Sequence, residues 1–343
     1  MTKDFQLQTA LTLSQQSTSG PLAQLTAAEE SIFQGVLTAL TVLALSANCL
    51  SLLVIYGVVS QLTPPLRLLT SLSFAQMLTP WAVMTIYLSR SPCRDEIHTS
   101  VLLTSHNATA LTLFALAMIH NIASFRPFHY TSIASARRLW VSVAVIWIVS
   151  LTLGHVHFLV SLGSDDDHHA TPYDGGYCSR VAHHTGISLS ISLSLAFVVI
   201  LTGVVIYRRI LASLLPVEAF FVNAPSSRSP NGVVTGIALL TCYAVAWVPY
   251  LVVRMVVAHG SVESRTSLMV TGIWQAVIVV SCFIDPVIYG VRMETLRNGY
   301  GKLAQRIRNR VAGAWVRCRS RLRCLDDDDF PTTPLNHIDA ISY

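Results

Sequence analysis

Charged side chains are scarce in this sequence of 343 residues. Asp, Glu, Lys and Arg together make up only 12% of the chain, about half the share that is usual in a soluble globular domain. Hydrophobic residues make up 52%. This composition excludes a soluble fold and predicts a membrane protein.

Long apolar stretches recur along the chain. A helix needs about 20 mainly apolar residues to cross the hydrocarbon core, because all its backbone groups must be satisfied within the segment. The stretches that meet this requirement are 32–59, 66–88, 97–125, 139–162, 185–211, 233–257 and 267–289. The sequence therefore predicts an all-α membrane protein whose seven transmembrane helices form one bundle.

The basic residues predict the orientation of this bundle. Lys and Arg near membrane ends stay on the cytoplasmic side. With the N-terminus outside, the outer side holds only Lys3, Arg90, Arg94, Arg180, Arg254 and Arg265 of the 23 Lys and Arg. We therefore expect a multi-pass protein with its N-terminus outside and its C-terminus in the cytoplasm. The expected organisation is an extracellular tail (1–31), the transmembrane domain (32–291), an amphipathic surface helix (292–316) and a cytoplasmic tail (317–343).

The surface helix is predicted from a regular apolar stripe among basic residues. The apolar positions are Leu296, Tyr300, Leu303, Ile307, Val311 and Trp315. This pattern suits a short helix that lies on anionic membrane lipids, although a solvated basic tail is the alternative. The net charge of +5 then belongs to the cytoplasmic face, and nucleic acid is not an expected partner.

The seven cysteines divide according to the predicted topology. Cys93 and Cys178 are the two on the oxidising outer side, so we expect a disulfide between them. Cys318 and Cys324 lie among arginines at the inner surface. They could be acylated with a lipid chain, or they could remain free thiols. The cysteines inside the predicted spans are interpreted as small core residues.

The predicted outer loop between residues 163 and 184 is rich in aspartate and histidine. Histidine titrates near neutral pH and both residue types bind transition metals. Their spacing fits no defined metal motif, so a solvated acidic loop is the simpler interpretation and we predict no metal site.

Several short motifs agree in order and spacing with one receptor family. Over residues 32–310 the chain resembles the rhodopsin-like (class A) G-protein-coupled receptors. The matching motifs are "SANCL" with Asn48, "VIWIV" with Trp147, "AWVPY" with Trp247 and Pro249, and "DPVIY" with Asp285, Pro286 and Tyr289. The segments "PPLRLLTSLSF", "RPFHYTSIAS" and "DPVIYGVRMETLR" are similar to odorant receptors of fishes, which makes chemosensory membership a secondary interpretation.

The resemblance implies a ligand pocket between the third, fifth, sixth and seventh spans. The residues that it places there are Leu102, His106, Asn107, Ser190, Trp247, Tyr250, Arg254 and Trp274. Leu102 replaces the aspartate of amine receptors, and Val279 replaces the retinal-binding lysine, so amines and a retinal cofactor are not expected. Arg254 could pair with an anionic ligand or extend to the outer interface. His106 could line the pocket or be a core histidine.

The chain departs from the family at the inner end of the third span. In this family an acid holds the neighbouring arginine at rest, and the arginine meets the G protein when the cytoplasmic end opens. The resemblance places Ile119, His120 and Asn121 at the positions of this acid, this arginine and the tyrosine that follows. Histidine cannot reproduce the permanent charge of arginine, so we expect weakened or unusual coupling to the G protein. The residues that the resemblance assigns to coupling and switching are His120, Asn121, Arg126, Tyr207, Pro249 and Tyr289.

A second departure concerns the polar core. Gln76 stands where the family usually has a buried aspartate, whereas Asp285 stands where asparagine is commoner. We expect Asn48, Thr109 and Ser281 near Asp285. An acid inside a membrane usually faces a partner, water or the bundle interior, so this cluster could bind sodium weakly or hold a protonated carboxyl group.

Three classes of function follow from these features. A receptor that signals to a heterotrimeric G protein or arrestin, on binding a small molecule or a peptide, ranks first. A seven-helix scaffold or decoy that does not signal ranks second. A transporter, channel or enzyme ranks last, because the spans contain few ionisable groups.

Loss of the expected disulfide gives the first testable prediction. Cys178→Ser should reduce the amount of protein at the cell surface, because removing a native disulfide from a small secreted domain typically costs about 2–5 kcal/mol. Surface labelling and non-reducing electrophoresis measure this effect. Normal surface levels with unchanged mobility would contradict the predicted bond.

Overall fold

The computed structural model describes residues 27–59, 62–88, 92–163, 176–220, 231–258 and 264–327. All regular secondary structure in these ranges is helical. The helices are α2 (Ala27–Gly57), α3 (Pro64–Leu88), α4 (Pro92–Phe125), α5 (Pro127–Ile133), α6 (Ala136–Gly154), α7 (Val156–Gly163), α8 (Gly176–Phe220), α9 (Asn231–Ala258), α10 (Ser264–Arg292) and α11 (Glu294–Asp327).

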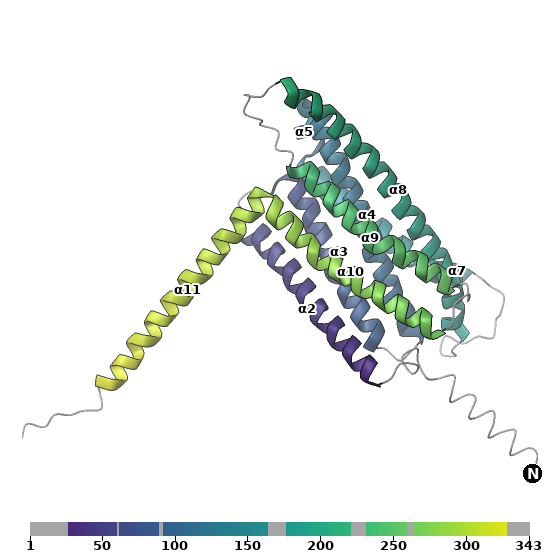
Figure 1. Cartoon of the computed structure of the whole chain (residues 1–343), viewed down its shortest axis with the longest axis horizontal. Helices are drawn as coiled ribbons and strands as arrows, with labels where there is room; N and C mark the ends of the chain where they lie inside the picture. The colour runs from purple at the N-terminus through teal and green to yellow at the C-terminus, as the bar shows by residue number, and fades with distance from the viewer. Residues whose placement is uncertain are drawn as a thin grey trace, which may run out of the picture.

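The long helices pack side by side into one bundle (Figure 1). α4 is central, because it packs against α3, α6, α8 and α9. α2 packs against both α3 and α10, which closes the other side of the bundle. Aliphatic side chains such as Ile148, Leu201 and Val245 point outward and are more than half exposed, as expected where the surrounding solvent is lipid.

Six of the described helices are long and apolar enough to cross a membrane. α3, which contains the second predicted span, is 25 residues long but is not among these six. Its polar side chains Ser71, Ser73, Gln76 and Thr79 are buried. They hydrogen-bond to α4, α6 and α10, so the low apolarity of α3 reflects the polar centre of the bundle.

The fourth predicted span is divided at His155 into α6 and α7. Gly154 lies directly against α4 at this break. A Cβ atom on Gly154 would come within 2.8 Å of the backbone N of Thr104 and 3.0 Å of the carbonyl O of Ser100, and it would also collide with the Thr104 hydroxyl. Only glycine allows this close approach of the two helices.

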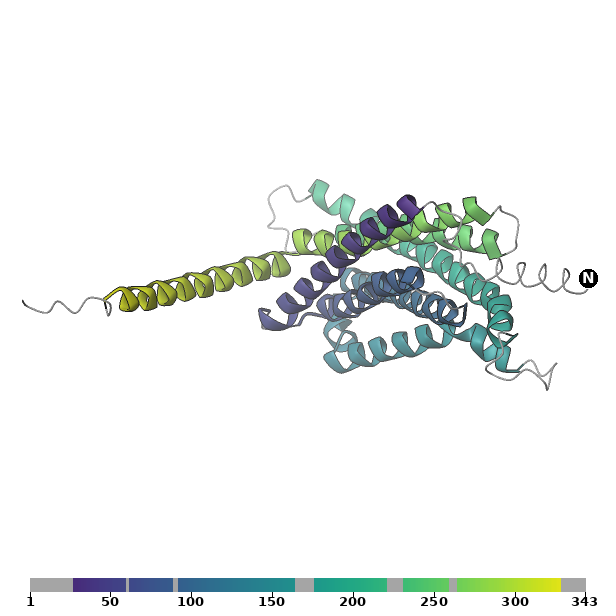
Figure 2. The ribbon, with the colours of Figure 1, turned by 90° about the horizontal axis from the view of Figure 1, so that it is seen from below.

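α11 is longer than the short helix that the sequence predicted, since it runs beyond residue 316 to Asp327. Its first turns are attached to the bundle: Leu296 is fully buried, the Tyr300 hydroxyl lies 2.7 Å from Ser51 Oγ, and Arg306 Nη1 donates to the carbonyl O of Gly57 at 3.0 Å. The remainder extends away from the bundle (Figures 1 and 2).

The outer part of α11 carries an apolar stripe that the bundle does not cover. Ile307, Val311 and Trp315 are each more than half exposed and recur at four-residue intervals, so they share one face of the helix. The helix lies across the bundle axis in Figure 1, which is the direction that a helix on the membrane surface requires.

Several predicted features lie outside the described residues. The side chains of Cys93, Cys178, Cys318 and Cys324 are not described, so the disulfide and the acylation sites stay predictions. The same holds for most of the N-terminal tail, for the aspartate- and histidine-rich part of the outer loop, and for residues 328–343.

The close contact between α6 and α4 gives the second testable prediction. Gly154→Ala should lower the stability of the purified protein by about 1–3 kcal/mol, the usual cost of overpacking a tight site. The backbone of Thr104 cannot move aside as a flexible side chain would. Gly186→Ala is the matched control, because a Cβ at Gly186 meets no atom within 4 Å. Equal melting temperatures for the two variants would show that the contact does not constrain the fold.

Candidate functional site

The polar centre of the bundle joins α2, α3 and α10. Asn48 is fully buried, and its side-chain amide donates to the carbonyl O of Ala44 and to that of Cys282, both at 2.9 Å. The second of these bonds connects α2 with α10. This asparagine therefore fixes the first and last spans of the bundle to each other, as its predicted place in the polar core requires.

Gln76 and Asp285 make the central contact of this site. Gln76 Nε2 of α3 donates a hydrogen bond to Asp285 Oδ2 of α10, and both side chains are buried. Cys242 of α9 also contacts the Asp285 carboxyl group. The glutamine thus supplies an uncharged hydrogen-bond partner for the acid.

The other predicted members of the cluster differ in what they contact. The Ser281 hydroxyl donates to the carbonyl O of Ile278 at 2.7 Å, so it serves its own helix. Thr109 is buried and its hydroxyl has no hydrogen-bond partner among the described residues. The same is true of Asp285 Oδ1, Gln76 Oε1 and Asn48 Oδ1. These oxygen atoms are available to water or to a small cation.

Tyr289 extends the polar core toward the end of α10 that leads into α11. It is fully buried, and its hydroxyl lies 2.9 Å from Ser73 Oγ of α3. The sequence placed Tyr289 among the switch residues. In this arrangement it connects α10 with α3, one layer below the contact between Gln76 and Asp285.

An aromatic cluster surrounds His106 in the middle of α4. The His106 ring stacks on Tyr243 with centroids 5.5 Å apart and lies 4.6 Å from the Trp247 ring. His106 Nε2 is 3.3 Å from the carbonyl O of Ser192 and 3.4 Å from the Tyr243 hydroxyl. Because a carbonyl can only accept, this geometry places the His106 proton on Nε2.

Of the predicted ligand-pocket residues, His106, Trp247 and Tyr250 belong to this cluster. Leu102, His106, Asn107, Trp247 and Tyr250 are all buried, and the Trp247 and Tyr250 rings meet edge to face at 6.0 Å. Trp274 is half-buried and packs against the hydrophobic core of the bundle. Tyr243 and Ser192 belong to the cluster as well. Sequence reasoning missed them because nothing in their local patterns identifies the residues that His106 meets.

Two predicted pocket residues lie at the edge of this cluster. The Ser190 hydroxyl donates to the carbonyl O of Gly186 on its own helix at 2.8 Å and also contacts Met255. Arg254 is half-buried and lies within electrostatic reach of the Tyr250 hydroxyl. Its Nε atom and both polar atoms of the Asn107 side chain have no hydrogen-bond partner among the described residues.

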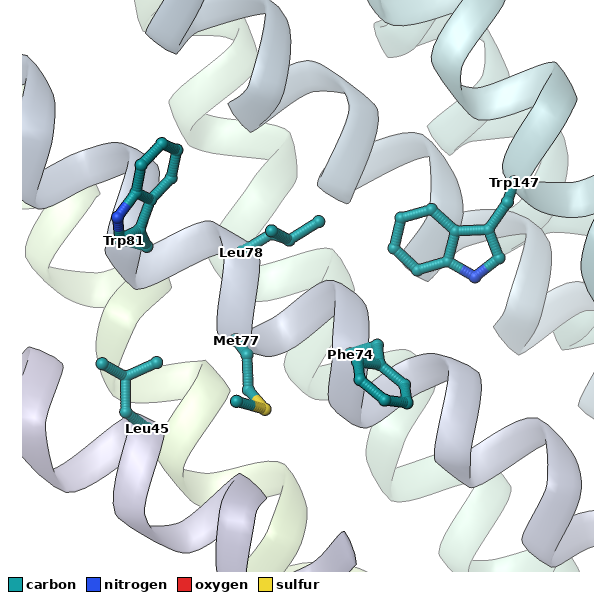
Figure 3. Close-up of a pocket in the computed structure, with 6 residues that line it drawn as sticks. All are labelled: Leu45, Phe74, Met77, Leu78, Trp81 and Trp147. Atoms are coloured by element: carbon teal, nitrogen blue, oxygen red, sulfur yellow. The ribbon is translucent and has the colours of Figure 1, made fainter.

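A pronounced hollow of about 650 Å³ lies elsewhere, between α2, α3 and α6. Figure 3 shows that Phe74, Met77, Leu78 and Trp81 follow α3, with Leu45 of α2 on one side and Trp147 of α6 on the other. The Trp147 indole N–H donates to Ser71 Oγ at 3.1 Å, so the ring presents only its apolar surface. None of the predicted ligand residues lines this hollow.

Ile119, His120 and Asn121 lie in the last turns of α4. Ile119 is buried in the apolar core, and His120 Nδ1 lies 3.3 Å from the hydroxyl of Tyr207 on α8. Asn121 is half-buried, whereas Arg126 is exposed just beyond the end of α4. The structure therefore brings together His120 and Tyr207 and leaves Arg126 outside the bundle.

Sequence reasoning missed a second histidine cluster, at the end of the bundle where α7 lies. His157 of α7 is fully buried; its ring nitrogens lie 3.0 Å from Ser100 Oγ of α4 and 2.8 Å from Ser188 Oγ of α8. Glu96 Oε2 is 4.0 Å from His157 Nε2 and accepts a hydrogen bond from Thr185. These contacts connect three helices, and no short motif in the sequence indicates them.

Comparison with known proteins identifies the family. A family model described as "7 transmembrane receptor (rhodopsin family)" matches residues 47–289. The chain belongs to the rhodopsin family of seven-transmembrane receptors. Melanocortin receptor 5 of mouse and that of rat are each 23% identical to this chain over 252 residues, which cover 68% of this chain and 72% of the relative.

The family match confirms the predicted receptor class and the seven-helix architecture. The chain is a multi-pass membrane protein, and its family is one of receptors rather than an enzyme class. Ligand binding and G-protein coupling are general properties of this family.

The contact between Gln76 and Asp285 gives the third testable prediction. Asp285→Asn should leave the folded protein intact, because the amide oxygen can still accept the hydrogen bond from Gln76. It should reduce the effect of sodium on thermal stability. Asp285→Leu removes the acceptor and should cost about 1–3 kcal/mol, the penalty for leaving a buried donor unpaired. Thermal unfolding with sodium or with choline as the cation measures both effects. Loss of folded Asp285→Asn protein would assign the acid a structural role instead.

Proposed function

We propose that this protein is a plasma-membrane receptor that transmits an extracellular ligand signal to a heterotrimeric G protein, and to arrestin, with weakened coupling. The observation that carries this proposal is the uncharged inner end of α4. His120 faces Tyr207 there, in place of the arginine that the family extends toward its transducer. The N-terminus is outside and the C-terminus is cytoplasmic, in accord with the distribution of Lys and Arg.

The ligand is a small molecule or a peptide that enters between α4, α8, α9 and α10. The unpaired buried groups of Asn107 and Arg254 support this location, because buried polar atoms in a native protein normally have partners. The relatives are named for melanocortin. Their 23% identity supports the receptor class for this chain and does not select its ligand.

Chemosensory function is the second candidate within the receptor class, and the odorant-receptor segments named above favour it. A scaffold or decoy that does not signal is the alternative outside that class. It is favoured by the same uncharged end of α4, since a receptor without the arginine could reach the surface and activate no transducer. A G-protein dissociation panel in cells separates these candidates.

The coupling defect gives the fourth testable prediction. His120→Arg should raise basal or ligand-driven G-protein activation, because it restores a cationic side chain to the opened cavity. A hydrogen bond to a charged group contributes about 1.5–3 kcal/mol, so transducer affinity should rise roughly 10- to 100-fold. The measurement is G-protein dissociation normalised to surface expression.

The control for this substitution is His129→Arg. His129 is exposed on α5, so that variant adds the same charge to the cytoplasmic face outside the bundle and should leave activation unchanged. If His120→Arg has no effect and the natural protein already couples at full strength, the proposed defect is wrong. If neither protein activates any G protein, the scaffold function is favoured.

A further inference from the structure

α9 packs its backbone directly against the pair formed by His120 and Tyr207. Of the two glycines in α9, Gly236 lies closer to this pair. A Cβ atom on this glycine would collide with the Tyr207 hydroxyl, would come within 2.7 Å of Tyr207 Cζ, and would lie 3.2 Å from His120 Nδ1. Tyr207 is buried, and His120 is half-buried. The two rings lie 6.1 Å apart at an interplanar angle of 53°, so one polar contact joins α4 and α8 where α9 covers it.

We propose that His120, Tyr207 and Gly236 form an uncharged latch that holds the cytoplasmic end of α9 against α4 and α8. The hydrogen bond between His120 and Tyr207 keeps the tyrosine in the position that Gly236 accommodates. Because Gly236 has no side chain, α9 can come close to Tyr207. The latch takes the place of the acid and arginine that the resemblance would place at positions 119 and 120. Its existence does not depend on the proposed function, but its effect on signalling does.

The latch lies where it can control an opening movement of α9. Pro249 lies inside α9, and a proline in a helix interior removes one backbone hydrogen bond and favours bending at that point. Gly236 lies about 20 Å from Pro249 along the helix. A bend at Pro249 displaces Gly236 farther than it displaces residues close to Pro249. A contact at Gly236 therefore restrains the bend more effectively.

The neighbouring glycine of α9 provides a matched control. A Cβ atom on Gly232, one turn before Gly236, would lie 3.6 Å from His120 Nε2, which is an ordinary van der Waals distance. Gly232→Ala and Gly236→Ala make the same chemical change one turn apart on the same face of α9. They differ in whether the new methyl group displaces Tyr207.

The test is hydrogen–deuterium exchange of the purified full-length receptor in lipid nanodiscs, followed in peptides that cover residues 231–243. Gly236→Ala should increase exchange roughly three- to tenfold, the range expected when one neutral hydrogen bond and its packing are lost. Gly232→Ala should match the natural protein. Equal exchange in Gly236→Ala and the natural protein, or an equal increase in both alanine variants, would overturn the proposal.

Tyr207→Phe keeps the test decisive if Gly236→Ala is poorly expressed. The phenylalanine removes the hydroxyl that His120 contacts, so it should also increase exchange in residues 231–243. Its effect should be less than additive with that of Gly236→Ala, because both substitutions break the same contact. Unchanged exchange in Tyr207→Phe, or fully additive effects, would contradict the latch.

G-protein dissociation in cells separates the latch from the proposed function. If both hold, Gly236→Ala raises basal activation along with exchange. Increased exchange without any activation retains the latch and contradicts the signalling function. Increased activation with unchanged exchange retains the signalling function and contradicts the latch.

Discussion

A hydrocarbon solvent offers no hydrogen bonds, and this constraint shapes the whole bundle. Every polar side chain within the spans must find a partner on another helix, on its own backbone or in trapped water. α3 illustrates the result, because its polar side chains face α4, α6 and α10 while Phe74 and Trp81 face outward. The asparagine at position 48 closes the bundle by joining α2 to α10.

The same constraint explains the arrangement around Asp285. An isolated carboxylate would be costly at this depth, and Gln76 reduces that cost by donating a hydrogen bond to it. A second acid at position 76 would place two like charges together. Glutamine at position 76 therefore suits the acid at position 285. One amide and one acid meet there between α3 and α10.

The inner end of the bundle follows a different design from its polar centre. Here His120 and Tyr207 meet in a hydrogen-bonding contact, and α9 packs against this contact at Gly236. A hydrogen bond between neutral groups is weaker than a charge-assisted one. Close packing of the helices therefore contributes more to the stability of this end of the bundle. In the proposed latch, the position of α9 depends on how Gly236 fits against Tyr207.

The sequence was sufficient for features that depend on the solvent around each segment. The sequence alone shows apolar stretches long enough to span a membrane and an uneven distribution of Lys and Arg. It also shows that position 120 holds a histidine and not an arginine. The positions of Asn48, Trp247 and Asp285 followed from short motifs. The apolar stripe of α11 was also predicted from its spacing, although its extent was not, because a basic helical pattern gives no clear end signal before Asp327.

Only the tertiary structure decided which polar groups meet. His120 and Tyr207 are 87 residues apart, Gln76 and Asp285 are 209 apart, and the cluster around His157 joins three helices. Ser281, which was expected beside Asp285, turns to its own backbone. The physical reason is that such pairings depend on the rotation and separation of packed helices. Glycines such as Gly154 and Gly236 set that separation, and their importance appears only when the neighbouring helix is in view.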